Sequence, residues 1–207
     1  MRRRAQAALA ALVLVVGLST YAGWGWWHNR PPYGPEVLAA TATLEFASFE
    51  AASTALGGVS APLTDDGDQL VLGRVSWRPP PRPQKDTTFW ITVLDKRSQR
   101  KAAVMAAASS RQDKVVLGSG GDLRRAADRY PWLSGIDGRE VDGQWWDPGN
   151  SVFVSASDAT PLTFVALFPS ADTPQRPESA IPTAPVALSD LLVALVHVGP
   201  DGQVYWA

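Results

Sequence analysis

Among the patterns in this sequence, two adjacent tryptophans with acidic residues around them are the most suited to binding or chemistry. Aromatic faces stack on sugar rings, and two carboxyl groups beside them can act as acid and base on a glycosidic bond. The residues concerned are Trp145, Trp146, Glu140, Asp142 and Asp147. Tryptophans in such a turn-rich region more often close the edge of a core, because their rings chiefly contribute buried apolar area. The cluster is therefore a candidate glycan-binding site, with core packing as the favoured alternative.

Two further motifs resemble reactive sites but lack an essential part. The run Gly118–Gly121 follows a predicted strand, as in a phosphate-binding turn, yet Leu123 occupies the place of the third glycine of a dinucleotide fingerprint. Ser98 and Lys101 have the Ser-x-x-Lys spacing of penicillin-binding proteins, which also need a Lys-Thr-Gly strand and a much longer chain. The sequence therefore predicts a surface turn at the first motif and a solvated turn between two strands at the second.

No catalytic or metal site is predicted from the histidines, from the clustered aspartates or from the number of cysteines. His197 is one of only two histidines and is expected at the solvent-facing end of a helix, without a serine nucleophile. Asp65, Asp66 and Asp68 lack the spacing of a calcium loop and predict a solvated turn. The absence of cysteine excludes disulfides, thiolate metal sites, thiol catalysis and lipid-modified cysteine. No catalytic, metal or cofactor residue is predicted, and the chain is expected not to be an enzyme.

The elements that would position these residues predict an α+β domain. Period-two alternation of apolar residues, short apolar runs and turn signals predict strands. These strands are expected at Val71–Trp77, Phe89–Val93, Val115–Leu117, 152–156, 162–168 and Gln203–Trp206, with 152–168 as the best hairpin. Helices are expected at Glu36–Leu56, stopped by Gly57 and Gly58, at Asp122–Arg129, and at Asp190–Val198, capped by Ser189. The predicted fold is a mostly antiparallel β-sheet with two or three helices.

Three other segments receive weaker assignments. Ala content favours a helix for residues 36–56, although four residues would also suit a strand, namely Thr41, Thr43, Phe46 and Phe49. Residues 101–108 fit either a strand or an Ala-rich helix, and the sequence does not decide between them. The Pro- and Ser-rich stretch from Ser170 to Pro185 is expected to be an exposed loop.

The N-terminal segment predicts a membrane-spanning helix. Arg2, Arg3 and Arg4 precede an uncharged run of 23 residues from Ala5 to Trp27. As a helix this run would be about 34 Å long, enough to cross the roughly 30 Å hydrocarbon layer of a bilayer. The predicted anchor residues are Leu9, Leu12, Val13, Leu14, Val15, Val16, Leu18, Trp24, Trp26 and Trp27, the tryptophans lying at the headgroup level.

The arginines before the run also predict its orientation. Positive charge is retained in the cytoplasm, so the N-terminus is expected inside and everything after Trp27 outside. The expected parts are a cytoplasmic stub and anchor at 1–27, a Pro-rich linker at 28–35 and a single extracytoplasmic domain at 36–207. The alternative is a signal peptide cleaved near Ala22, which would release the same domain outside.

Charge and composition limit the partners of that domain. Four of the 19 basic residues and none of the 20 acidic residues precede Gly34, which leaves 15 basic and 20 acidic side chains. A net negative domain gains nothing from counterion release, so nucleic acid is not an expected partner. Composition resembles that of proteins from GC-rich bacteria. The leading hypothesis is therefore a bacterial envelope protein, anchored in the lipid bilayer, that binds another envelope protein; the alternative is a cell-wall glycan-binding module.

Overall fold

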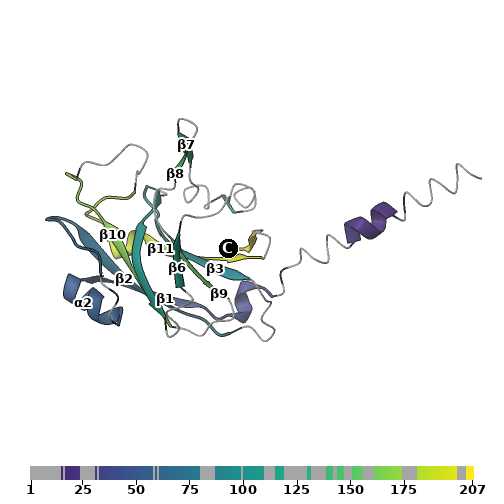
Figure 1. The fold of residues 1–207 in the computed structure, drawn as a ribbon, viewed down its shortest axis with the longest axis horizontal. Helices are drawn as coiled ribbons and strands as arrows, with labels where there is room; N and C mark the ends of the chain where they lie inside the picture. Colours follow the sequence, from purple (N-terminus) through teal and green to yellow (C-terminus); the bar gives the residue numbers. More distant parts are fainter. Residues whose placement is uncertain are drawn as a thin grey trace, which may run out of the picture. The chain divides into compact units, whose positions relative to one another are not determined.

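The chain consists of two compact units, Met1–Pro32 and Tyr33–Ala207. The computed structural model describes residues 15, 17–23, 31, 33–57, 59, 61–79, 87–98, 100–109, 115–118, 130–131, 139–141, 144–146, 151–155, 161–173, 181–199 and 204–207, without the side chains of 116, 118, 139–141 and 144–146. In the first unit residues 17–23 are helical (Figure 1). No helix among the described residues combines the length and apolar composition that crossing a membrane requires.

The described residues of the second unit lie mostly in β-strands (Figure 1). The helical segments among these described residues are the 3₁₀ turns η1 (Pro35–Val37) and η5 (Leu188–Asp190) and the helix α2 (Phe49–Ala55). Its strands are β1 (Thr41–Ala47), β2 (Gln69–Ser76), β3 (Thr88–Asp95), β4 (Arg100–Lys101), β5 (Ala103–Ser109), β6 (Val115–Gly118), β7 (Arg139–Val141), β8 (Gln144–Trp146), β9 (Ser151–Ser155), β10 (Leu162–Phe168), β11 (Leu191–Val198) and β12 (Val204–Trp206).

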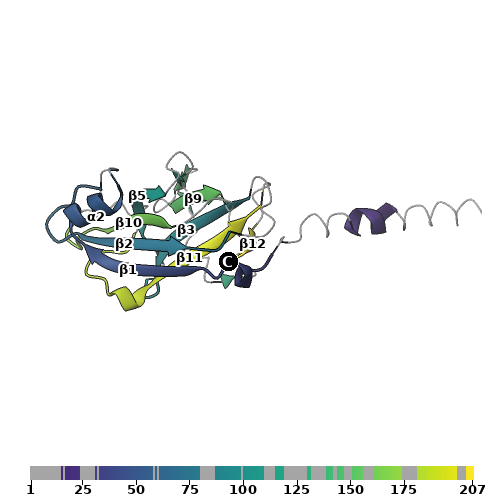
Figure 2. The same ribbon diagram turned by 90° about the horizontal axis from the view of Figure 1, so that it is seen from below.

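The strands form two main sheets in which all neighbours are antiparallel. The first sheet has the order β1-β2-β10-β5, and Figure 2 shows β1 outermost beside β2 and β10. The second has the order β12-β11-β3-β9-β6, with β4 also paired to β3, and β7 and β8 form a separate hairpin. The predicted α+β class with a mostly antiparallel sheet is therefore confirmed.

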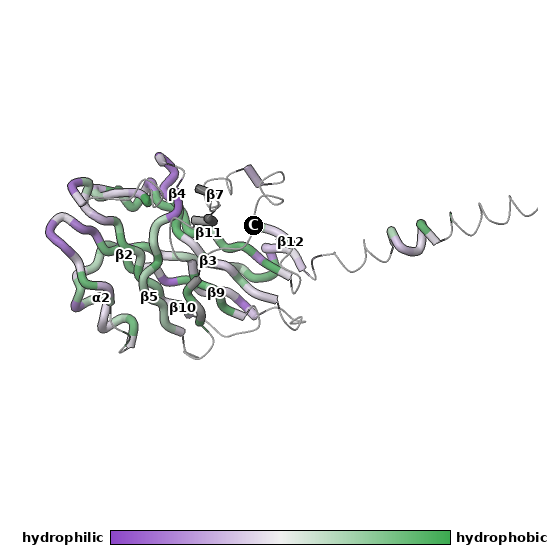
Figure 3. The backbone as a smooth tube through the Cα atoms, turned by 45° about the horizontal axis from the view of Figure 1, so that its top comes forward, coloured by the Kyte–Doolittle hydropathy of each residue, from purple (hydrophilic) through white to green (hydrophobic). Residues whose placement is uncertain are grey.

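The main core brings together side chains from both sheets. Val71 and Phe164 of the first sheet share one buried cluster with Phe89, Ile91 and Val152 of the second. Apolar stretches accordingly follow β2, β10 and β3, as the green tube shows in Figure 3. Burial of such aromatic and branched side chains contributes about 1.5–3 kcal/mol each, so this cluster is the main source of stability.

Close packing within the first sheet depends on a glycine. Gly73 of β2 lies directly opposite Phe164 of β10. A Cβ atom at Gly73 would lie 2.1 Å from Cζ of that ring, so only glycine leaves room for it. On the other side of the sheet a second buried cluster joins Ala52 and Leu56, from α2 and its C-terminal cap, to Leu72 and Val165.

The predicted helix over Glu36–Leu56 is wrong in its first half. Residues 41–47 form β1, because threonines and aromatic residues there prefer the extended backbone. The helix begins only after Ser48, whose Oγ accepts a hydrogen bond from the Ala51 backbone N–H at 3.2 Å. Gly57, with φ of 64°, ends the helical segment, as its sequence position predicted.

Two predictions for the C-terminal half are also wrong. Residues 191–198 form the strand β11 and not a helix, because a strand buried on both faces reads as a continuous apolar run that resembles a helix. The predicted hairpin of 152–156 and 162–168 does not exist, since β9 and β10 belong to different sheets. Both strands are present. Residues 103–109 form the strand β5, so the segment 101–108, for which strand and helix were both open, is mainly a strand.

The described ends of the predicted Ser170–Pro185 loop are part of the domain and are not fully exposed. Ala184 is buried, forms a parallel bridge with Ser170, and precedes a cis peptide bond to Pro185. Asp68 Oδ1 accepts a hydrogen bond of 2.7 Å from the Ser170 backbone N–H, which ties the predicted aspartate turn to this segment. The predicted helix at Asp122–Arg129 lies outside the described residues.

Candidate functional site

The strand β1 is a terminal strand of the first sheet, and most of its residues are exposed. It pairs with β2 from Thr41↔Ser76 to Ala47↔Leu70 without a register shift, and within the described part of the chain no strand pairs with its other side. Five of its seven residues are exposed. Because alternate residues of an edge strand direct their N–H and C=O groups away from the sheet, β1 presents a row of backbone groups to solvent.

The two faces of β1 have different chemistry. Ala42, Leu44 and Phe46 lie opposite core residues of β2, yet the Phe46 side chain remains 49% exposed. Thr43 and Glu45 occupy the other face, where Glu45 Oε1 lies 3.2 Å from the Arg74 guanidinium. The edge therefore offers apolar side chains on one face, polar ones on the other, and backbone hydrogen-bonding groups between them.

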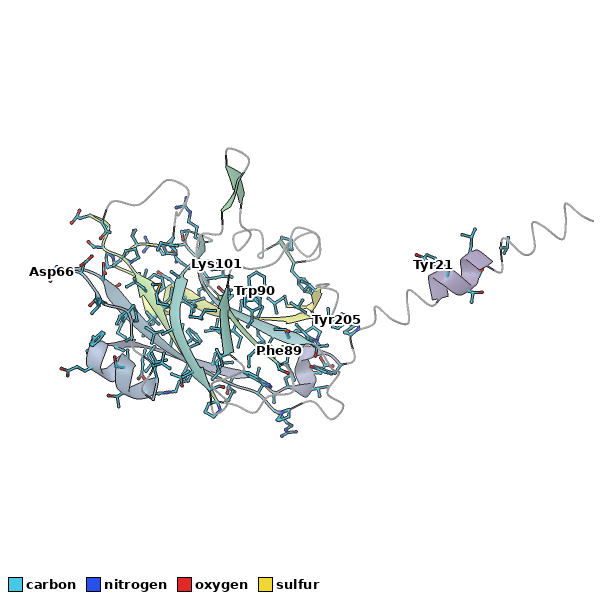
Figure 4. The ribbon with its side chains drawn as sticks, in the orientation of Figure 1. Tyr21, Asp66, Phe89, Trp90, Lys101 and Tyr205 are labelled. Atoms are coloured by element: carbon cyan, nitrogen blue, oxygen red, sulfur yellow. The ribbon has the colours of Figure 1, made fainter. Side chains whose placement is uncertain are left out.

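A second candidate is an aromatic cluster around His197, which is fully buried. The Tyr33 ring stacks on the imidazole with centroids 4.9 Å apart, and its Oη lies 3.3 Å from Nε2. Phe89, Tyr205 and Trp206 place their rings 5.3, 5.2 and 5.0 Å from the same imidazole, and Figure 4 shows Phe89 and Tyr205 at one end of the strands. The expectation that His197 faces solvent on a helix is wrong, because β11 is a strand inside the sheet.

The electrostatics of this cluster indicate packing and not proton transfer. Burial lowers the pKa of His197 to about 4. Burial also raises the pKa of Tyr33 to about 12, against the opposing effect of a hydrogen bond with Thr87. Both groups are therefore uncharged at neutral pH. Nδ1 of His197 is buried without a hydrogen-bond partner among the described residues, so no second group orients the imidazole as a base.

A third candidate is a cleft of about 570 Å³ between the turn after β3 and the segment before η5. Burial tends to raise the pKa of Asp95, but hydrogen bonds from Ser98 and the Arg97 backbone and the charge of Arg97 outweigh it and lower that pKa. Ser98 Oγ donates to Asp95 at 2.7 Å, and Arg97 lies 3.8 Å from Asp190. Asp95 and Ser98 thus stabilise the turn, and Arg97 and Asp190 offset each other's charge.

The turn after β3 also corrects the expectation for the Ser-x-x-Lys motif. Lys101 was expected in a solvated turn, but its side chain is fully buried. Its Nζ lies 5.7 Å from the centroid of the Trp90 ring, close to the contact distance of a cation–π pair (Figure 4). Ser98, by contrast, is engaged with Asp95. The two motif residues contact different groups, as a chance match predicts.

The proposed glycan residues are only partly described. Glu140 lies in β7 directly opposite Trp145 of β8, and Trp146 lies opposite Arg139. The side chains of these residues, and Asp142 and Asp147 altogether, lie outside the described residues. The backbone therefore brings an acid and a tryptophan to paired positions, and the glycan hypothesis stays a prediction.

The predicted membrane anchor is described at only two of its residues. Val15 and Leu18 are helical and exposed, at 61% each. The remaining predicted anchor residues, namely Leu9, Leu12, Val13, Leu14, Val16, Trp24, Trp26 and Trp27, lie outside the described residues. The membrane anchor therefore stays a prediction.

The described residues show no metal site, and comparison with known proteins adds no site. Within the described ranges no group of three or more His, Asp or Glu residues lies close enough to hold a metal ion. No family model, curated protein or solved structure matches this chain. The β1 edge is the feature that reasoning from sequence missed, and the alternation of Ala42, Leu44 and Phe46 with polar residues was the signal for it.

Proposed function

We propose that the chain is a single-pass membrane protein whose second unit lies outside the cytoplasm and binds a protein partner without catalysing a reaction. The arginines and the uncharged run from Ala5 to Trp27 support the anchor and its orientation. The exposed edge of β1 supports binding and is the observation that carries the proposal. Its partner would be an extended protein segment that adds a strand to the sheet.

The composition of β1 supports this role, because the strand lacks the usual protection of a free edge. Folded proteins block edge strands with lysine, proline, a bulge or short length, since an open edge pairs with other chains. β1 has seven residues and an uninterrupted register, and it contains no lysine or proline. Its single charge, Glu45, is already paired with Arg74. Binding of a partner strand would explain why this edge has no such protection.

A site-specific photocrosslinker tests the binding proposal in intact cells. Incorporated at Thr43, on the exposed strand, it should give discrete crosslinked species that include a protein. Incorporated at Leu63, which is 87% exposed but outside any strand, it should give none above background. Equal, diffuse labelling at both positions would show that β1 is not a binding surface.

A reporter enzyme that is active only outside the cytosol tests the topology when it is fused behind Ala207. Activity of the fusion is the expected result, because the positive charges before Ala5 hold the N-terminus inside. Retention of an N-terminal tag in the membrane fraction, on the same polypeptide as the reporter, distinguishes an anchor from a signal peptide cleaved near Ala22. A reporter active only in the cytosol would overturn the proposed location.

A further inference from the structure

We infer that the strand added to β1 is β1 of a second copy of the chain, antiparallel and related by a two-fold axis at Leu44. The inference rests on the proposed function, because it names the partner of the same edge. The pairing would join two first sheets into one sheet with the order β5-β10-β2-β1-β1-β2-β10-β5. Such isologous contacts are the commonest way in which identical chains associate.

The geometry of an antiparallel pair restricts the register. Only residues of the same parity can face each other, because alternate residues of β1 direct their backbone groups outward. A two-fold axis must therefore pass through one residue. An axis at Glu45 would place two carboxylates opposite each other, which destabilises a pair of strands. An axis at Leu44 uses all seven residues from Thr41 to Ala47 and avoids this repulsion.

The side chains of β1 are complementary in the Leu44 register. On the apolar face the ring of Phe46, which is 49% exposed in one copy, would lie opposite the small Ala42 of the other. On the polar face Glu45 would lie opposite Thr43, whose hydroxyl can donate a hydrogen bond to the carboxylate. Arg74 lies opposite Thr43 within each copy, so the two carboxylates are interleaved with two guanidinium groups. Large residues meet small ones, and charges alternate.

The size of this contact predicts where it forms. A pair of seven-residue strands buries less than the roughly 1,200–2,000 Å² of a typical stable interface, so free copies should associate weakly. Two copies held in one membrane have a raised effective concentration. This favours association through a small contact, although the contact itself is the same. The pairing should therefore be measured in membranes that contain the full chain.

Disulfide formation between engineered cysteines tests the register, since the chain contains no cysteine. Thr43→Cys and Glu45→Cys chains carrying tags of different size are expressed together in membranes. The mixed pair lies directly opposite in the Leu44 register, whereas each like pair is diagonal and about 7–8 Å apart, beyond the reach of a disulfide. We expect the mixed dimer in at least about fivefold excess over both like dimers.

Further variants keep the test decisive. Leu44→Cys should form a dimer with itself, because that residue would lie on the axis. Leu192→Cys, whose side chain is 44% exposed on β11, is the control for random collision and should not. Equal yields of mixed and like dimers, or Leu44→Cys no more reactive than Leu192→Cys, would overturn the inference. If the Thr43 photocrosslinker still captured a different protein, the proposed function would stand without the self-pairing.

Discussion

β1 and the aromatic cluster around His197 both leave polar groups unpaired, but in opposite surroundings. Five of the seven residues of β1 are exposed and no described strand pairs with its free side, so a partner can reach the backbone groups there. Nδ1 of His197 is enclosed by aromatic rings. An unpaired polar group that is buried costs free energy and contributes to no interaction. The comparison teaches that accessibility, and not the type of residue, separates a candidate binding site from a packing feature.

The other edge of the first sheet supports this distinction. β5 is also a terminal strand, yet Val104, Ala106 and Ala108 are buried and the strand lies beside β6 of the second sheet. Among the described elements, β1 lies mainly beside β2, α2 and the 3₁₀ turn η5, and no described strand pairs with its free side. The domain thus covers one edge of the sheet with its own chain and leaves the other available.

The largest predicted effect concerns the packing role of the cluster. Phe89→Ala removes a fully buried ring that contacts His197, Trp77 and Trp206, so it should lower the free energy of unfolding by about 3–5 kcal/mol. Phe46→Ala, the matched change on β1, should cost less than about 1 kcal/mol because that ring is half exposed. Urea denaturation measures both. Equal losses would remove the contrast between cluster and edge.

The pH dependence of stability tests the same cluster. Because the pKa of His197 is about 4 in the folded chain and its ordinary value is 6.5, the unfolded chain binds more protons between these values. Stability should be full above pH 6.5 and fall as the pH is lowered to about 4, by up to about 3 kcal/mol. The difference from His197→Phe isolates this contribution from that of the carboxylates. Parallel pH profiles for the two proteins would contradict the buried, neutral histidine.

A charge introduced on β1 separates folding from pairing. Thr43→Glu places a carboxylate beside Arg74 within the chain but opposite Glu45 of a second copy. Folding should be stabilised by less than about 0.5 kcal/mol, whereas disulfide yield from Leu44→Cys should fall about tenfold. Thr43→Arg should have the reverse effects. If both variants changed pairing in the same direction, the assigned register would be wrong.

The smallest effect is expected for the ion pair on β1. Both side chains of Glu45 and Arg74 are about half exposed, so Glu45→Gln should change the free energy of unfolding by less than about 0.5 kcal/mol. The change is measured by thermal unfolding at low and high salt. A loss above about 1 kcal/mol would show that the pair holds β1 in place and is not mainly a surface feature.

The sequence predicts the strands of this fold better than their arrangement. Alternating residues such as Val71 and Val75 predict β2 and β3, a short apolar run predicts β6, and a turn signal predicts β12, and all four strands lie where they are predicted. Pairing depends on contacts between distant segments, which explains why β9 and β10 separate into different sheets. Residues 191–198 were assigned to a helix because strands buried on both faces lose their alternation.

The candidate site was predicted less well than the fold for a physical reason. The motifs considered in the sequence rely on reactive side chains, whereas the β1 edge consists of backbone groups that every residue possesses. Only the order of strands reveals that these groups are free. The burial of His197 and Lys101 depends in the same way on neighbours far along the chain.

Hydrogen exchange of the β1 amides in the full chain, reconstituted in bilayers, tests the central claim most directly. Alternate amides of Thr41–Ala47 that face away from β2 should be protected at least about tenfold over unpaired amides, because a second strand bonds to them. Thr43→Glu should abolish this protection while the amides bonded to β2 keep theirs. Rapid exchange of the outward amides in the unmodified chain, equal to that in Thr43→Glu, would contradict strand pairing at this edge.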